Sequence, residues 1–358
     1  MTPLEKLVEN RRIIICCGSG GVGKTTTAAA LAIAGAQRGR RSCVVTIDPA
    51  KRLADALGLE SLTNHPSRVE GEWPGELWAM MLDTKGTFDD LVVRYSLDPE
   101  QTRTILDNPL YRNISSALSG TQEYMAMEKL YELHAEGGFD LVVVDTPPTR
   151  NALDFLDAPR RLTRFLDNRI FRLLMMPTRA YLRAVSLATQ AFLRTISKVV
   201  GGDVVQDAVN FFTAFEGMEQ GFRERAQRMV ELLADPGTAF LLVASPRRDA
   251  VEEALFFAQK LHDQGVAVQA LIVNRLFPRF GAVPDVGKRS LAAPLAGLVA
   301  NLRDLEGIAE REETHFAALA ERVAPAPVAR VPFLASDVHD LAGLETIGDY
   351  LFSPAASA

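Results

Sequence analysis

The chain has 358 residues, of which 47% are hydrophobic and 23% are charged, and its formal net charge is −6. This composition is typical of a folded protein. It excludes disorder along the whole chain and is unlike that of a general nucleic-acid binder, which carries excess positive charge. No apolar run approaches the roughly 20 residues of a membrane-spanning helix, and Met1–Asn10 lacks the apolar stretch of a signal peptide. We therefore expect a cytoplasmic protein without a nucleic-acid partner.

The N-terminal segments predict a strand, a helix and a second strand in succession. Ile13–Cys17 is a continuous apolar run, which is typical of a strand buried on both faces of a parallel sheet. Thr25–Gln37 is rich in alanine and is followed by Gly39, which favours a helix that ends just before the glycine. Cys43–Ile47 predicts the next buried strand. Together these segments form a βαβ unit.

The alternation of strands and helices returns later in the chain. We predict further strands over Leu77–Leu82, Leu141–Val144, Ala239–Ala244, Val266–Val273 and Val328–Phe333, and helices over Asp249–His262 and Asp340–Leu351. Two long stretches show helical patterns and no convincing strand. The predicted architecture is one α/β domain over residues 1–358, with a doubly wound parallel sheet from about 10–83, 138–150 and 236–352, and an inserted helical lobe from about 84–137 and 151–235.

A glycine-rich motif lies between the first predicted strand and helix. Gly18-Ser19-Gly20-Gly21-Val22-Gly23-Lys24-Thr25 matches every fixed position of the phosphate-loop pattern G-x-x-x-x-G-K-[ST]. Its glycines let backbone N–H groups approach phosphate oxygens, and the helix N-terminus adds a favourable dipole. We expect the loop, together with Thr26, to bind ATP. Lys24 is then predicted to contact the β- and γ-phosphates and act in catalysis, and Thr25 to ligate Mg²⁺. The motif thus indicates a P-loop NTPase fold.

Two aspartates end predicted strands and are candidates for the chemistry at this loop. Carboxyl ends of strands border the ligand crevice in a doubly wound sheet, so we predict that Asp145 lies near Mg²⁺. The alternative is a simple turn carboxylate. Asp48 is predicted to contribute to the metal site and to orient the attacking water. Its alternative role is to cap the helix that begins near Lys51.

Four sequence blocks resemble those of the arsenical pump-driving ATPases, a family that also holds the eukaryotic targeting factor for tail-anchored membrane proteins. They are Gly18–Thr27, Thr46–Leu57, Phe139–Leu156 and Leu271–Arg275. The resemblance implies a Mg²⁺-dependent ATPase that works as a dimer, with two nucleotides facing each other across the interface.

The resemblance also implies a role for three strand-end residues. Asp48 would belong to the first nucleotide-sensing switch, Asp145 to the second, and Asn274 would form a hydrogen bond with the adenine. From the residues alone, Asn274 is as readily a turn residue that ends a strand.

The chain departs from the family pattern in two respects. Ser19 stands where the family carries a lysine that reaches the nucleotide of the partner subunit, so we expect slow hydrolysis in isolation. Lys51 or Arg52 is a possible substitute, although both are equally interpreted as exposed helix residues.

The zinc-binding and metalloid-binding cysteines of the family are also missing, since the three cysteines fall in predicted core strands (Cys16, Cys17 and Cys43). We expect no zinc and no arsenite site. With one phosphate loop, the chain would form a homodimer, or a heterodimer with a paralogue that supplies the lysine.

Residues 158–198 form a strongly basic segment in a chain that is acidic overall. They hold eight arginines and one lysine against a single acid, Asp167, among many apolar residues. Such a helix either packs in the lobe with solvated arginines, or binds hydrophobic segments of client proteins at or near a membrane. We predict a client surface that includes Phe171, Leu174, Met175 and Met176. Three functional classes remain open: a chaperone or targeting ATPase for hydrophobic membrane-protein segments, the motor subunit of a membrane transporter, and a nucleotide-dependent positioning switch.

Overall fold

The computed structural model describes residues 1–47, 52–117, 121–147, 149–167, 217–281 and 293–353, together with residues 207, 210, 211 and 214. The chain divides into two compact units. The first comprises Met1–Met81, Leu133–Leu153 and Pro236–Ala358, and the second comprises Leu82–Glu132 and Asp154–Asp235.

The first unit is built on one eight-stranded sheet with the order β3-β4-β2-β5-β1-β6-β7-β8. Its strands are β1 (Ile13–Cys17), β2 (Arg41–Thr46), β3 (Ser67–Val69), β4 (Glu76–Met81), β5 (Leu141–Asp145), β6 (Thr238–Ala244), β7 (Val268–Leu276) and β8 (Val328–Pro332). Every neighbouring pair is parallel except β3–β4, which is antiparallel. The chain winds outward from the central β1 in both directions, so the predicted doubly wound parallel sheet is confirmed.

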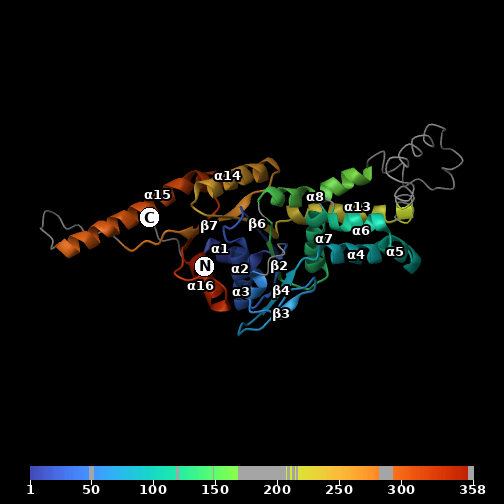
Figure 1. Cartoon of the computed structure of the whole chain (residues 1–358), viewed down its shortest axis with the longest axis horizontal. Helices are drawn as coiled ribbons and strands as arrows, with labels where there is room; N and C mark the ends of the chain where they lie inside the picture. Colours follow the sequence, from blue (N-terminus) through green and yellow to red (C-terminus); the bar gives the residue numbers. More distant parts are fainter. Residues whose placement is uncertain are drawn as a thin grey trace. The chain divides into compact units, whose positions relative to one another are not determined.

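Helices cover both faces of this sheet (Figure 1). α14 and α15 pack against each other and against β6 and β7, whereas α1, α2 and α16 form a layer that contacts β2, β5 and β8. The bounds of these helices and of the short α3 are α1 (Pro3–Asn10), α2 (Lys24–Gln37), α3 (Arg52–Ala56), α14 (Arg248–Asp263), α15 (Ala293–Val323) and α16 (Leu341–Phe352). Alternate strand residues such as Ile14, Val44 and Val143 share one buried cluster with α1, α2 and α16. The apolar strands are buried because helices cover them on both sides.

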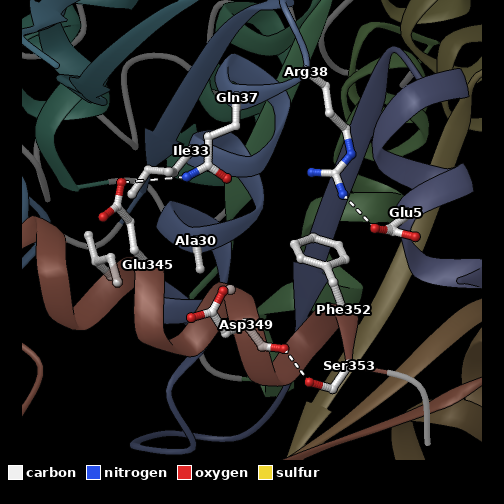
Figure 2. A pocket seen from close by; sticks show the side chains of 11 residues that line it. Glu5, Ala30, Ile33, Gln37, Arg38, Glu345, Asp349, Phe352 and Ser353 are labelled. Carbon is white, nitrogen blue, oxygen red and sulfur yellow. Dashed lines mark hydrogen bonds and ion pairs between the residues drawn. The ribbon is translucent and has the colours of Figure 1, made fainter. Parts of the chain in front are cut away.

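The α1–α2–α16 layer is held together at its edge by Arg38. The guanidinium of Arg38 donates to the Glu5 carboxylate at 3.0 Å and lies 4.7 Å from the centre of the Phe352 ring. These residues line a pocket of about 370 Å³ that also receives polar side chains of α2 and α16, among them Gln37 and Asp349 (Figure 2). Its lining includes no residue of the phosphate loop.

The second unit is helical in the residues that the structure describes. It contains α4 (Thr84–Tyr95), α5 (Pro99–Leu106), α6 (Pro109–Ala117), α13 (Glu219–Ala234), and most of α7 (Thr121–Ala135) and α8 (Thr149–Asp167). A buried ion pair joins α7 and α13, because Arg225 Nε donates to Glu128 Oε1 at 2.8 Å. The Arg225 guanidinium also lies 3.9 Å from the centre of the Tyr131 ring.

No helix in the described ranges combines the length and apolarity needed to cross a membrane. Three elements of the structure have no counterpart among the predicted elements, namely α1, β3 and α15. β3 has only three residues, which is too short for an alternating pattern to show.

Candidate nucleotide-binding site

The glycine-rich loop connects β1 to α2 at the carboxyl edge of the sheet. Its backbone approaches the neighbouring strands so closely that side chains would collide. A Cβ atom on Gly18 would lie 2.1 Å from the Val243 carbonyl oxygen, and one on Gly23 would lie 2.2 Å from the Asn274 Nδ2 atom. Gly23 is also the N-cap of α2 and has a φ of 97°, which a side chain rarely permits. The two glycines are therefore required by the geometry of the loop.

Lys24 is folded back over this loop. Its side chain is buried, and its Nζ atom donates to the Ser19 carbonyl oxygen at 2.8 Å. A buried ammonium at a helix N-terminus leaves an excess of positive potential there. The arrangement suits an anion held by the loop, which would contact both the ammonium and the first amides of α2.

Asp145 lies at the end of β5, next to the first turn of α2. Its Oδ2 atom accepts hydrogen bonds from Thr25 Oγ1 at 2.7 Å and from Thr46 Oγ1 at 3.0 Å, and the residue is 1% exposed. The contact follows from the sheet order, since β5 lies between β1 and β2 and Asp145 pairs with Thr46 in the parallel register. Thr25 and Asp145, predicted as metal ligands from distant parts of the sequence, are thus brought together.

This hydroxyl–carboxylate pair offers hard oxygen ligands, which Mg²⁺ prefers. Mg²⁺ in nucleotide sites takes one or two protein ligands and completes its shell with phosphates and water, so the pair fits such an ion. Among the described residues, no group of three or more His, Cys, Asp or Glu side chains is placed to hold a metal by itself.

Asn274 contacts the phosphate loop from β7. Its Nδ2 atom donates to the Val22 carbonyl oxygen at 2.9 Å, and its Oδ1 atom accepts from the backbone N–H of Arg275 at 2.9 Å. The predicted hydrogen bond of Asn274 with adenine stays a prediction. Asn274 nevertheless lies beside the loop, as expected for a strand end at this edge.

A cavity of about 630 Å³ opens at this edge. Glycines of the loop, Lys24, Thr25, Thr26, Asp145 and Asn274 line it. Its size lies in the range of small-ligand sites. The lining also includes residues after β8, among them the exposed Phe333, and Arg52 of α3.

The segment after β8 was not predicted to line the site. The signal was available, because β8 was predicted as a strand and the carboxyl end of every parallel strand borders the same crevice. Asp48 and Lys51, and the client surface of Phe171, Leu174, Met175 and Met176, lie outside the described residues.

A model of the family described as "Anion-transporting ATPase" matches residues 11–284, which cover the loop, Asp145 and Asn274. The chain belongs to this family. Members of the anion-transporting ATPase family are ATPases, which accounts for a phosphate loop backed by a strand-end aspartate.

Three similar proteins come from different organisms. "ATPase get3" of Aspergillus terreus is 26% identical over 358 residues, which cover 98% of this chain and 94% of the relative. "ATPase ASNA1 homolog" of Dictyostelium discoideum is 27% identical over 276 residues, covering 76% of this chain and 75% of that protein. A protein of Aquifex aeolicus provisionally named arsenical pump-driving ATPase 1 is 25% identical over 371 residues, covering 95% and 78%. Similarity to individual ATPases therefore extends over nearly the whole chain.

Proposed function

We propose that this chain binds ATP with Mg²⁺ in the cavity beside the phosphate loop and hydrolyses it there. The hydrogen bond between Thr25 and Asp145 carries this proposal, because it joins the two oxygen ligands that a nucleotide-bound Mg²⁺ requires at the helix N-terminus that attracts phosphate. When bound, Mg²⁺ neutralises charge on the phosphates and polarises the group that is transferred.

The side chains of the site would divide the remaining work. Lys24 would move its ammonium from the Ser19 carbonyl to the β- and γ-phosphates, which it can reach from the first turn of α2. Phe333 lines the same cavity, is 62% exposed, and would offer an aromatic face to a base. Asp48 would hold the attacking water in line, and Asp48→Asn is expected to keep ATP affinity while turnover falls at least about a hundredfold.

The experiment for ATP binding is calorimetry with Mg²⁺–ATP. Lys24→Ala removes the ammonium that offsets the phosphate charge, so we expect binding to be lost. Lys6→Ala is the matched control, since it removes an exposed lysine of α1 and should leave affinity unchanged. Wild-type affinity in Lys24→Ala would contradict the proposed site.

We further propose that nucleotide controls a dimer whose helical surfaces capture hydrophobic segments of membrane proteins in the cytoplasm. The family resemblance, together with the dense apolar and methionine-rich sequence that includes Phe171, Leu174, Met175 and Met176, supports this role. The dimer partner would be a second copy or a paralogue.

Hydrogen exchange measured with ADP and with a non-hydrolysable ATP analogue tests the capture role. A client surface should differ strongly in protection over residues 165–193 between the two states. Polar replacements at Phe171, Leu174 and Met175 should then reduce binding of a hydrophobic helical peptide and spare ATP affinity. Equal and strong protection in both states would favour a purely structural segment.

A second candidate is the ATPase subunit of a membrane anion transporter, which the family description favours. The two roles separate on what stimulates turnover. A hydrophobic helical peptide should raise the ATPase rate of a targeting factor, whereas an oxyanion should raise that of an anion-pump subunit. Against arsenite in particular, all three cysteines are buried in strands.

A further inference from the structure

Arg275 has a backbone conformation that sets it apart in the part of the chain that the structure describes. It is the one non-glycine residue there with a positive φ, at 63°. Such a conformation disfavours a residue with a side chain, and it persists where the surroundings hold it in place. Strained residues of this kind concentrate at functional sites, so the contacts of Arg275 are informative.

The strain arises from an irregularity in the sheet. β7 and β8 pair Asn274 with Val331 and Leu276 with Pro332, so Arg275 is an extra residue on β7. A bulge of this type turns a side chain away from its regular direction. Here the bulge falls where β7 passes the phosphate loop.

The side chain of Arg275 reaches this loop. Its Nη1 atom donates to the Gly21 carbonyl oxygen at 3.0 Å, while Asn274 Nδ2 donates to the next carbonyl, that of Val22, at 2.9 Å. The backbone N–H of Arg275 also donates to Asn274 Oδ1, which fixes the orientation of the carboxamide. Two neighbouring residues of β7 thus hold two consecutive carbonyls of the loop.

Holding these carbonyls has a consequence for the opposite ends of the peptide groups. In a trans peptide the C=O and the following N–H point in opposite directions. With the carbonyls of Gly21 and Val22 turned toward β7, the N–H groups of Val22 and Gly23 point away from it. These are amides of the phosphate loop, whose N–H groups cradle phosphates in this motif.

We propose that Arg275 is a positioning residue that fixes the phosphate loop in its anion-binding conformation through the Gly21 carbonyl. The inference rests on the proposed nucleotide site and deepens it. Arg275 lines the 630 Å³ cavity but is exposed, so its guanidinium acts on the loop from the outside and not from within the cradle.

The decisive variant is Arg275→Gly, because glycine accepts the positive φ and the change removes only the side chain. Affinities for Mg²⁺–ADP and Mg²⁺–ATP should each fall by about three- to tenfold, the scale of one hydrogen bond. Because the loop amides hold the phosphates equally before and during the reaction, KM for ATP should rise while kcat stays nearly unchanged. In the nucleotide-free protein, hydrogen exchange of the loop amides should become faster.

Arg279→Ala is the matched control. Arg279 follows four residues later and forms an ion pair with Glu306 at 4.0 Å, so its loss removes the same charge without touching the loop. It should change neither affinity nor exchange. A positioning role also predicts that the ratio of wild-type to Arg275→Gly affinity holds from low to high salt, whereas a direct pull on the phosphates would be screened.

Three results would overturn the inference: wild-type affinity and loop exchange in Arg275→Gly, an equal loss in Arg279→Ala, or a loss that disappears at high salt. Failure of the proposed function has a different signature. In that case the wild-type protein itself would not bind Mg²⁺–ATP, or Lys24→Ala would bind it as well as the wild type does.

Discussion

At the scale of single residues, one carboxylate oxygen organises the candidate site. Asp145 Oδ2 accepts from Thr25 of α2 and from Thr46 of β2, so three segments that are remote in sequence meet at one atom. The side chain is almost fully buried, and its charge therefore requires close partners. A Mg²⁺ ion bound beside Thr25 would be such a partner.

Asp145→Asn should separate metal binding from nucleotide binding. The amide keeps the size of the side chain but removes the charge that attracts Mg²⁺. We expect Mg²⁺-dependent turnover to fall at least about a hundredfold, while binding of ATP in the absence of Mg²⁺ is unchanged or stronger. Steady-state kinetics over a range of Mg²⁺ concentrations provide the measurement. A normal Mg²⁺ dependence in this variant would leave Asp145 with the role of a turn carboxylate.

Elements of the first unit are tied by charge as well as by apolar contact, and Glu5 is the clearest case. The backbone N–H of Thr2 donates to Glu5, and this bond, together with the nearby Arg38, holds the pKa of the carboxyl below its ordinary value of 4.5. A lowered pKa means that the charged form stabilises the fold. Its contribution is present above pH 4.5 and is lost as the pH falls through the lower pKa of the folded state.

Glu5→Gln should therefore destabilise the protein in a pH-dependent way. At neutral pH we expect a loss of roughly 0.5 to 1 kcal/mol in the free energy of unfolding, the scale of one helix-cap interaction at a partly exposed site. The difference from the wild type should shrink as the pH falls below 4.5. Urea denaturation at several pH values measures it. A difference that is constant with pH would show that the charge of Glu5 is immaterial.

In the second unit, α7 and α13 are joined by the buried pair of Glu128 and Arg225. Burial raises the pKa of Glu128, although the guanidinium beside it favours the charged form. Arg225→Met should lower the free energy of unfolding by about 3 to 5 kcal/mol, because it leaves the buried Glu128 carboxylate without its charged partner.

The double variant Glu128→Leu with Arg225→Met serves as the control for this pair. It replaces both charges by apolar groups and should recover most of the lost stability, as measured by urea denaturation. A double variant no more stable than Arg225→Met would show that packing against Tyr131, and not the unpaired charge, dominates the loss.

At the scale of the whole molecule, the fold class followed from short apolar runs. Ile13–Cys17 was predicted with the bounds that β1 has, and the runs near β2, β5 and β6 fell within a residue or two of the strands. A strand that is buried on both faces of a parallel sheet is a nearly continuous apolar run, which is easily recognised in the sequence and explains this success. α15 was not anticipated, although it has 31 residues. Its first ten residues carry no charged side chain and expose leucines at 295 and 298, so the polar side that marks a surface helix begins only at Arg303.

Residues of the site could be predicted from the loop motif, from strand ends and from the family resemblance, but most of their contacts could not. The loop is contiguous, so Lys24 and Thr25 were assigned from spacing. The hydrogen bond of Thr25 with Asp145 depends on the strand order, which no local pattern states. The hydrogen bond of Arg275 with Gly21 depends on a one-residue bulge in β7. The bulge is visible only in the pairing of β7 with β8, so the sequence of β7 alone does not predict it.

Ser19 bears on the proposed dimer. Its side chain is buried in the loop and carries no charge, so we expect slow turnover of the isolated protein. Ser19→Lys should raise turnover at least about tenfold if the dimer places the new ammonium near the partner's nucleotide, since a cation at the transferred group contributes about 10³-fold or more. Ser245→Lys is the matched control, because Ser245 is similarly buried. Ser245 and Ser19 also line one further cavity, which lies beside the phosphate loop. Brisk wild-type turnover that is lost in Lys51→Ala or Arg52→Ala would show that a cation is already supplied.

The three cysteines allow opening of the central sheet to be measured by the rate at which their thiols are labelled. Cys16 and Cys17 end β1 and Cys43 lies in β2, all of them buried, and burial raises the pKa of each thiol. A neutral, covered thiol reacts with a maleimide only after the central sheet has come apart, so the labelling rate counts sub-global unfolding events. Because β1 leads directly into the phosphate loop, saturating nucleotide should lower the labelling rate in the wild type and leave it unchanged in Lys24→Ala. Thiol labelling would then report how much of the protein has nucleotide bound, without a modified nucleotide and without a measurement of hydrolysis.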